Sequence, residues 1–378
     1  MFLNKLRLCL SGFASLTMVF WAGTAHAEWK LNLTQGVTPI SREVYDLHML
    51  ILYIVTIIAI GVFAVLFWSV FHHRKSKGAI AAKFHHSTAA EITWTIIPIL
   101  ILVGMAIPAT KTLIKMEQTG DAEITVKVTG YQWKWKYDYM EDGLSFFSAL
   151  AQDSIDARQR GSGIDPNSVD HYLRDVDNPM VLPVKKKIRI LTTANDVIHA
   201  WWVPALGWKR DAIPGFINDN WTYIDEPGTY RGQCAELCGK DHGYMPIVLK
   251  AVPEDEYIAW VEEMKLAQAE AAAGSDREWT MDELMTRGAE VYGANCSACH
   301  LPTGKGLPGT FPALDGGAIV TGPVEGHINQ VLLGKNLMPA FGEQLSDADI
   351  AAVITYERNS WSNSTGDAVQ PADVKAAR

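Results

Sequence analysis

Two long apolar stretches stand out in the first third of the chain. Residues 49–71 and residues 92–110 contain no charged side chain, and the second stretch includes Pro98 and Pro108. About 20 apolar residues in a helix cross a ~30 Å hydrocarbon core, and membrane helices tolerate proline better than soluble helices do. Neither stretch has the polar face with which a soluble helix meets water. The pattern therefore predicts a transmembrane hairpin over residues 28–115 rather than a buried helix pair of a soluble protein.

The charges between the two stretches predict their orientation. Residues 72–86 carry no acid and four basic side chains: Arg74, Lys75, Lys77 and Lys83. Because positively charged loops remain in the cytoplasm, this connection is expected to face inward. Both chain ends, and all residues after Lys115, are then expected on the outer, periplasmic side of a bacterial inner membrane.

The first 27 residues predict a signal peptide. Two basic residues precede an apolar run from Leu8 to Trp21, and Ala25-His26-Ala27 is typical of a cleavage site. A membrane anchor is the alternative, but the apolar run is short for one. Cleavage after Ala27 would leave four cysteines, in two close pairs.

The polarity pattern becomes that of strands from residue 123 onward. The segment YQWKWKYDY alternates so that one aromatic face is predicted for Tyr131, Trp133, Trp135, Tyr137 and Tyr139. Further short strand patterns follow at 186–194, 221–233 and 245–252, whereas 145–178 is typical of a long loop insertion. Several short strands with one buried face predict a β-sandwich or β-barrel over residues 116–262.

The last third of the chain changes character again. Residues 263–277 are rich in Ala, Glu and Gln and predict a linker, and residues 278–361 predict a compact helical domain. Ser346-Asp347-Ala348-Asp349 is an acidic first turn that suits the start of its closing helix. The small, polar residues 362–378 predict a disordered tail.

Composition and charge add two constraints. Hydrophobic residues make up 48% of the chain, and their excess lies in the first 115 residues, which agrees with a membrane protein. The formal charge of −9 argues against a nucleic-acid partner, since such proteins normally carry a basic stripe. The same charge is compatible with a basic protein partner.

One short segment concentrates metal-binding side chains. Residues 231–245 read RGQCAELCGKDHGYM, and a further histidine, His199, ends a predicted strand. A disulfide between Cys234 and Cys238 is the simplest alternative for a periplasmic domain. It leaves His242 and Met245 unexplained, and a zinc site would use Cys and His without Met. Thiolate, thioether and imidazole together favour copper, and two thiolates suggest more than one copper ion.

A second motif predicts a covalent haem. Cys296-Ser297-Ala298-Cys299-His300 is the C-x-x-C-H pattern, in which two thiols bind the haem vinyl groups and the imidazole binds the iron. A thioredoxin-like thiol pair would be expected near a βαβ unit, and the sequence predicts none. After His300 the remaining candidates for the sixth iron ligand are Met338, which we favour, and His327.

The copper motif carries a family resemblance. It resembles the dinuclear copper A signature of subunit II of haem-copper cytochrome c oxidases, over about residues 28–262, and so implies a cupredoxin-like domain. The resemblance implies that both cysteines bridge two coppers and that Glu236 contributes its backbone carbonyl. The six matching positions are His199, Cys234, Glu236, Cys238, His242 and Met245.

The same resemblance implies three further roles. Trp133 would receive electrons from a docked cytochrome c, although it also fits a core aromatic on an alternating strand. Glu91 would stand at the entrance of a proton path, although Thr88–Glu91 also reads as a helix capping box. The Glu236 side chain is a candidate magnesium ligand at the interface with subunit I.

Together these features predict an electron-entry subunit with a fused cytochrome, similar to caa3-type oxidases. Electrons would pass from a cytochrome c donor through haem c and copper A to subunit I, where oxygen is reduced to water with proton translocation. Subunit III is a further expected partner. The alternatives are the copper A subunit of a nitric-oxide reductase, a membrane-anchored copper-binding cytochrome, and a thiol oxidoreductase using Cys234 and Cys238; a quinol oxidase subunit would lack the copper ligands.

Overall fold

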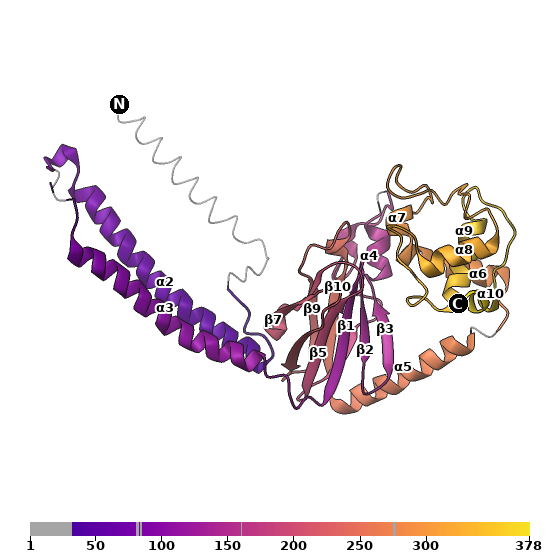
Figure 1. Ribbon diagram of the computed structural model, residues 1–378, viewed down its shortest axis with the longest axis horizontal. Helices are drawn as coiled ribbons and strands as arrows, with labels where there is room; N and C mark the ends of the chain where they lie inside the picture. The colour runs from indigo at the N-terminus through magenta and orange to yellow at the C-terminus, as the bar shows by residue number, and fades with distance from the viewer. Residues whose placement is uncertain (1–31, 81–82, 84, 160, 275–276) are drawn as a thin grey trace, which may run out of the picture. The chain divides into compact units, whose positions relative to one another are not determined.

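The computed structural model describes residues 32–80, 83, 85–159, 161–274 and 277–378 (Figure 1). The predicted signal peptide lies outside the described residues. The described chain contains a helical hairpin, a two-sheet β-sandwich and a helical C-terminal region.

The hairpin consists of two long helices, α2 (Pro39–His72) and α3 (Thr88–Met116). Both are longer than the apolar stretches 49–71 and 92–110, and both have the length and composition of membrane-spanning helices. Figure 1 shows them side by side, and an ion pair between Glu43 and Lys115 joins them near one end. The polar extensions beyond the apolar stretches therefore lengthen the hairpin at its ends.

The two helices begin differently. At the start of α2, Thr38 and Ser41 form a reciprocal capping box, which satisfies backbone N–H groups that have no partner within the helix. The prediction of a capping box formed by Thr88 and Glu91 is wrong. Thr88 is already helical, and Ser87 precedes the helix without a side-chain cap.

The sandwich is built from two five-stranded sheets. The first has the order β3-β2-β1-β5-β8, and its strands are β1 (Ile124–Tyr131), β2 (Lys134–Tyr139), β3 (Leu144–Ser148), β5 (Lys187–Ala194) and β8 (Asn218–Tyr223). The second has the order β4-β10-β9-β6-β7, and its strands are β4 (Met180–Pro183), β6 (His199–Val203), β7 (Trp208–Ala212), β9 (Gly228–Cys234) and β10 (Pro246–Val252). The parallel pairs β1–β5 and β4–β10 join strands that are distant in the sequence.

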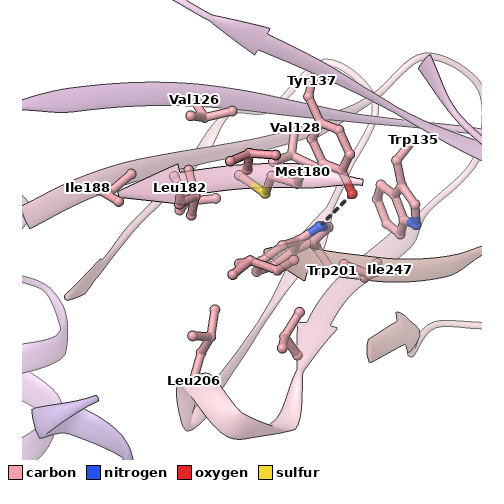
Figure 2. Packing of buried hydrophobic residues seen from close by; sticks show 14 of the residues in the cluster. Val126, Val128, Trp135, Tyr137, Met180, Leu182, Ile188, Trp201, Leu206 and Ile247 are labelled. Carbon is pink, nitrogen blue, oxygen red and sulfur yellow. Dashed lines mark hydrogen bonds between the residues drawn. The ribbon is translucent and has the colours of Figure 1, made fainter. Parts of the chain in front are cut away.

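The space between the sheets is filled by large apolar side chains. Trp135, Tyr137 and Trp201 are all fully buried, and Figure 2 shows them packed together with aliphatic residues of both sheets. Trp201 Nε1 donates to Tyr137 Oη at 3.5 Å, which gives two buried polar atoms a partner. Each such burial contributes about 1.5–3 kcal/mol relative to exposure, so this core fixes the sheets that carry the site.

The aromatic segment 131–139 is not one continuous strand, contrary to the prediction. Residues 132 and 133 form a turn, and Tyr131 pairs with Lys134 across the hairpin. Paired residues share a face of the sheet, so Tyr131 lies on the face opposite to Trp135. The sequence pattern did not reveal this change of face, because the turn at residues 132 and 133 interrupts the alternation of the two strands.

The predicted linker is largely helical. Helix α5 (Glu254–Gly274) continues from the sandwich through most of residues 263–277, and Tyr257 and Val261 pack into the sandwich core. The predicted loop insertion at 145–178 is also partly ordered. It contains the end of β3, a short helix α4 (Gln152–Ala157) and a 3-10 turn.

The C-terminal region is a helical domain with its own core. Its helices are α6 (Met281–Asn295), α7 (Ser297–His300), α8 (Val324–Leu333), α9 (Asp347–Asn359) and α10 (Pro371–Ala377). Thr280 and Glu283 form a capping box at the start of α6. The acidic turn predicted for the closing helix is confirmed at α9, where Ser346 accepts a hydrogen bond from the Asp349 backbone.

The tail is ordered, which corrects the prediction of disorder for 362–378. Val369 and Val374 are buried in the core of the helical domain. Gln370 Oε1 accepts from the Trp279 backbone N–H at 2.8 Å, and Gln370 Nε2 donates to the Trp279 carbonyl at 3.1 Å. These contacts, together with the ion pairs of Asp367 with Arg358 and of Arg378 with Asp347, hold a segment whose composition is otherwise small and polar.

We expect Gly288→Ala to destabilise the helical domain. A Cβ at Gly288 would lie 2.2 Å from the Ala352 carbonyl oxygen, so α6 and α9 would have to separate. Such overpacking costs about 1–3 kcal/mol, and thermal unfolding followed at the haem absorbance should show a lower midpoint. Gly326→Ala is the matched control, since a Cβ there meets no atom within 4 Å. Equal midpoints for the two variants would contradict the packing argument.

Candidate copper and haem sites

The cysteine loop is held at both ends by paired strands. β9 ends at Cys234, β10 begins one residue after Met245, and the Cys234 N–H donates to the Met245 carbonyl at 3.3 Å. The pairing of Gln233 with Pro246 continues this ladder. The two ends of the loop are thereby fixed side by side, and the residues between them must fold back over the end of the sheet.

This folding brings soft donor atoms together. Cys238 Sγ lies 3.8 Å from Cys234 Sγ, 3.4 Å from His242 Nδ1 and 3.5 Å from Met245 Sδ. Cys234 Sγ lies 3.3 Å from the Glu236 carbonyl oxygen. Five of the six predicted copper-site residues are therefore gathered by one loop.

The sixth residue, His199, comes from β6. Its ring is fully buried, Nδ1 lies 3.9 Å from Cys234 Sγ, and Nε2 lies 2.9 Å from Asp196 Oδ1. The other Asp196 oxygen accepts from the Gln132 backbone N–H at 2.7 Å. One carboxylate thus fixes both the ring of His199 and the turn that carries Trp133, as outer partners of metal-binding histidines do.

We expect Gly130→Ala to disturb this histidine. A Cβ at Gly130 would lie 2.7 Å from Cδ2 of the His199 ring, which is fully buried. The ring would be displaced from Cys234, so copper retention should fall by about 10–100-fold, the range typical of lost outer-sphere support. Copper content after dialysis against a chelator measures this, and Gly243→Ala, whose Cβ meets no atom within 4 Å, is the control. Unchanged retention in Gly130→Ala would show that the ring adapts.

The two thiols titrate as a coupled pair. Hydrogen bonding from Cys238 lowers the pKa of Cys234, and the His199 ring lowers it further. Hydrogen bonding with Cys234 and burial raise the pKa of Cys238, and the charge of an ionised Cys234 raises it further. Loss of both protons is therefore unfavourable without a cation beside the pair.

The donor set fits copper. The Sγ atoms are 3.8 Å apart, which is longer than the ~2.05 Å of a disulfide, and all four cysteines among the described residues are free thiols. Two sulfur anions, a thioether and two imidazoles are soft and borderline ligands, which favour copper over hard cations. The thioether within 3.5 Å of Cys238 distinguishes this set from a structural zinc site.

The structure separates the roles of the two neighbouring tryptophans. Trp133 is half-buried and its Nε1 donates to the Cys238 carbonyl at 3.2 Å. Trp135 is fully buried, and its Nε1 donates to the Met245 carbonyl at 3.4 Å. Trp133 therefore connects the protein surface to the cysteine loop, and Trp135 belongs to the core.

Two other predicted residues lie apart from these donors. Glu91 is exposed in the first turn of α3. The side chain of Glu236 is exposed, and the described residues place it in no group of three or more potential metal-binding side chains.

The haem motif lies on the single turn of α7. The His300 N–H donates to the Cys296 carbonyl at 3.0 Å, so one helical turn places both thiols and the imidazole together. His300 Nδ1 is 2.9 Å from the Pro312 carbonyl oxygen. That bond assigns the proton to Nδ1 and leaves Nε2 available for iron.

Met338 lies in a tight turn that lines one cavity together with the C-x-x-C-H motif. Met338 and Lys335 exchange two backbone hydrogen bonds of 3.0 Å, and Gln330 Nε2 lies 3.5 Å from Met338 Sδ. The cavity is lined by Cys296, Cys299, His300, Val331, Met338 and Val353. Two thiols, an imidazole and a thioether among apolar side chains fit a covalently attached haem.

The second candidate ligand, His327, is already engaged. It is buried, and its Nε2 lies 2.9 Å from Glu357 Oε2. A histidine with this partner must break a buried hydrogen bond before that nitrogen binds iron. Nδ1 of His327 has no hydrogen-bond partner among the described residues, so the bond to Glu357 occupies one ring nitrogen only, and Met338 stays the predicted ligand.

Several residues of these sites could not be found from the sequence motifs. Gln132 acts through contacts with Asp196 and Cys238, which are far along the chain, and Gly130 acts by leaving room for the His199 ring. Asp196 lies three residues before His199, and this spacing was the one local signal available.

Three family models match the chain. Residues 124–252 match the periplasmic domain of cytochrome c oxidase subunit II, residues 26–112 match its transmembrane domain, and residues 283–356 match cytochrome c oxidase, cbb3-type, subunit III. The chain is 39% identical over 234 residues to a probable cytochrome c oxidase subunit 2 of Rickettsia conorii, covering 62% of this chain and 71% of that protein. It is 37% identical over 241 residues to cytochrome c oxidase subunit 2 of Arabidopsis thaliana, covering 64% of this chain and 91% of that protein. Among solved structures, the periplasmic domain of subunit II (CoxB) of Bradyrhizobium japonicum is 42% identical, with a TM-score of 0.34, and the match covers 40% of this chain and 99% of that one.

Proposed function

Because the chain belongs to the cytochrome c oxidase subunit II family, we propose that it is the electron-entry subunit of a haem-copper oxidase and carries both haem c and copper A. The observation that carries this proposal is the convergence of two thiols, two imidazoles and a thioether on one volume at the end of the sandwich. The C-terminal cytochrome c domain supplies the second redox site.

Six residues are the proposed ligands of the copper pair. Cys234, Cys238, His199, His242, Met245 and the Glu236 carbonyl would hold the copper pair. When bound, the copper pair supplies one-electron redox chemistry. The buried His199 and its bond to Asp196 keep water and ligand rearrangement away from the pair.

The cytochrome domain is built for electron transfer rather than oxygen binding. Cys296 and Cys299 would hold the haem covalently, and His300 and Met338 would bind its iron. A haem held by a histidine and a methionine would supply one-electron transfer rather than oxygen binding. Oxygen reduction to water with proton translocation is then the work of subunit I.

The remaining roles follow the same proposal. Electrons would pass from a cytochrome c donor through this haem to copper A, with Trp133 as an entry residue beside Cys238. The hairpin would dock on subunit I and near subunit III, with Glu91 at a proton entrance and Glu236 beside a magnesium ion. The loop between α2 and α3 would face the cytoplasm, with the chain ends and both redox domains in the periplasm.

The test is metal and spectroscopic analysis of the full chain, produced where haem is attached. About two coppers and one haem per chain, with a mixed-valence copper signal in electron paramagnetic resonance (EPR) spectra, would support the proposal. Haem without copper, with Cys234 joined to Cys238 after copper treatment, would overturn it in favour of a membrane-anchored cytochrome. Co-purification with an oxygen-reducing large subunit would separate an oxidase from a nitric-oxide reductase with the same copper centre.

A further inference from the structure

The α4 segment, residues 149–177, is a closed unit beside the copper loop. Leu150 and Val176 form an isolated bridge, and the Ala151 N–H donates to the Asp175 carbonyl at 3.0 Å. Inside the segment, Ser154 Oγ accepts from the Leu173 N–H at 3.0 Å. These bonds fix α4 and the residue that ends it, Arg158.

Among the described residues, the Arg158 side chain has an ion pair and a ring contact with the copper loop. Its Nη2 donates to Asp241 Oδ1 at 2.9 Å, and its guanidinium carbon lies 3.7 Å from the centre of the Tyr244 ring. The side chains of Arg158 and Asp241 are 24% and 5% exposed, so this ion pair is largely removed from water. A planar guanidinium can satisfy a carboxylate and stack on an aromatic ring at the same time, which an ammonium group cannot do equally well.

The two residues that Arg158 contacts stand on either side of a metal ligand. Asp241 precedes His242 and Tyr244 follows it, and the Tyr244 N–H donates to the Asp241 carbonyl at 2.8 Å to close the turn. Within that turn, His242 Nδ1 faces Cys238 Sγ at 3.4 Å. Anything that holds Asp241 and Tyr244 therefore holds the backbone from which the His242 ring projects.

We propose that Arg158 is a positioning residue for copper A: it clamps the 241–244 turn and thereby fixes the orientation of His242. This inference rests on the proposed function, because it assigns Arg158 to the support of the copper pair. His199 is supported by Asp196 from its own loop. His242 receives its support from α4, a separate segment of the chain.

The test uses the full chain with haem attached and copper loaded, and compares Arg158→Ala with Arg158→Lys. In Arg158→Ala we expect about 10–100-fold faster copper loss to EDTA and an altered hyperfine pattern in the copper EPR signal. Arg158→Lys should lie between this variant and the wild type, because it keeps a charge opposite Asp241 and loses the planar contact with Tyr244. Arg189→Ala is the matched control, since it removes an ion pair with Asp219 on strands that carry none of the copper loop.

Four results would contradict the proposed role of Arg158 or the copper site itself. A wild-type hyperfine pattern and rate of copper loss in Arg158→Ala would overturn it, and so would equal effects in Arg189→Ala. If Arg158→Ala does not fold, Asp241→Asn weakens the same clamp, and a wild-type signal and rate in that variant overturns the inference. A wild-type chain that binds no copper pair would overturn the proposed function as well, whereas a loaded wild type with unaffected variants would overturn the clamp alone.

Discussion

Cys238→Ser is expected to abolish the mixed-valence copper signal and to leave the haem attached. Cys238 Sγ stands at the centre of the site, within 3.8 Å of Cys234 Sγ, His242 Nδ1 and Met245 Sδ. A serine hydroxyl is a hard, weakly acidic group that does not replace a bridging thiolate. Copper EPR and the haem absorbance of the same sample measure the two effects.

The reciprocal variant controls for general damage. Cys299→Ser removes one haem thioether from the other domain and should leave the mixed-valence signal unchanged. If the signal persists in Cys238→Ser, the assignment of this loop to a copper pair is wrong. Loss of haem in Cys238→Ser would instead point to a folding defect in the whole chain.

Met338→Leu is expected to keep the haem attached and to lower its reduction potential. Cys296, Cys299 and His300 remain, so attachment and the first axial bond are unaffected. Loss of the thioether removes the ligand that raises the potential of His/Met haems, and a fall on the order of 100 mV is reasonable where axial ligands set potentials over about 0.8 V. A redox titration and the sulfur-to-iron absorption band measure this change.

His327 supplies the control for this second prediction. His327→Gln should retain the sulfur-to-iron band, because His327 is bonded to Glu357 and lies outside the iron coordination sphere that we propose. The assignment fails if Met338→Leu retains the band and the wild-type potential. If His327→Gln changes both the sulfur-to-iron band and the reduction potential, His327 is the iron ligand instead of Met338.

The sequence predicts most of the architecture because its strongest signals are local. An uncharged apolar stretch indicates a membrane helix within a single window. Five copper-site residues lie within 12 positions, from Cys234 to Met245, and the haem residues share one helical turn. In both motifs the residue types and their spacing are sufficient to predict the ligand that the motif binds.

The predictions that the structure corrects depended on long-range contacts. The pairing of β1 with β2 decides on which face of the sheet each of residues 131–139 lies. Alternation in the sequence does not encode this pairing. The tail is ordered because Val369 and Val374 find a core built by α6, α8 and α9. Gly130 and Arg158 lie beside the proposed copper site through neighbours that only the fold brings close.

The reciprocal bonds between Trp279 and Gln370 have a consequence for the history of this chain. They join the first and the last segments of the cytochrome domain. A domain whose two ends meet can be appended to another gene through a single connection, or permuted, with little effect on its interior. Such a module can be gained or lost during evolution, in agreement with the match of residues 283–356 to a different family model from residues 124–252.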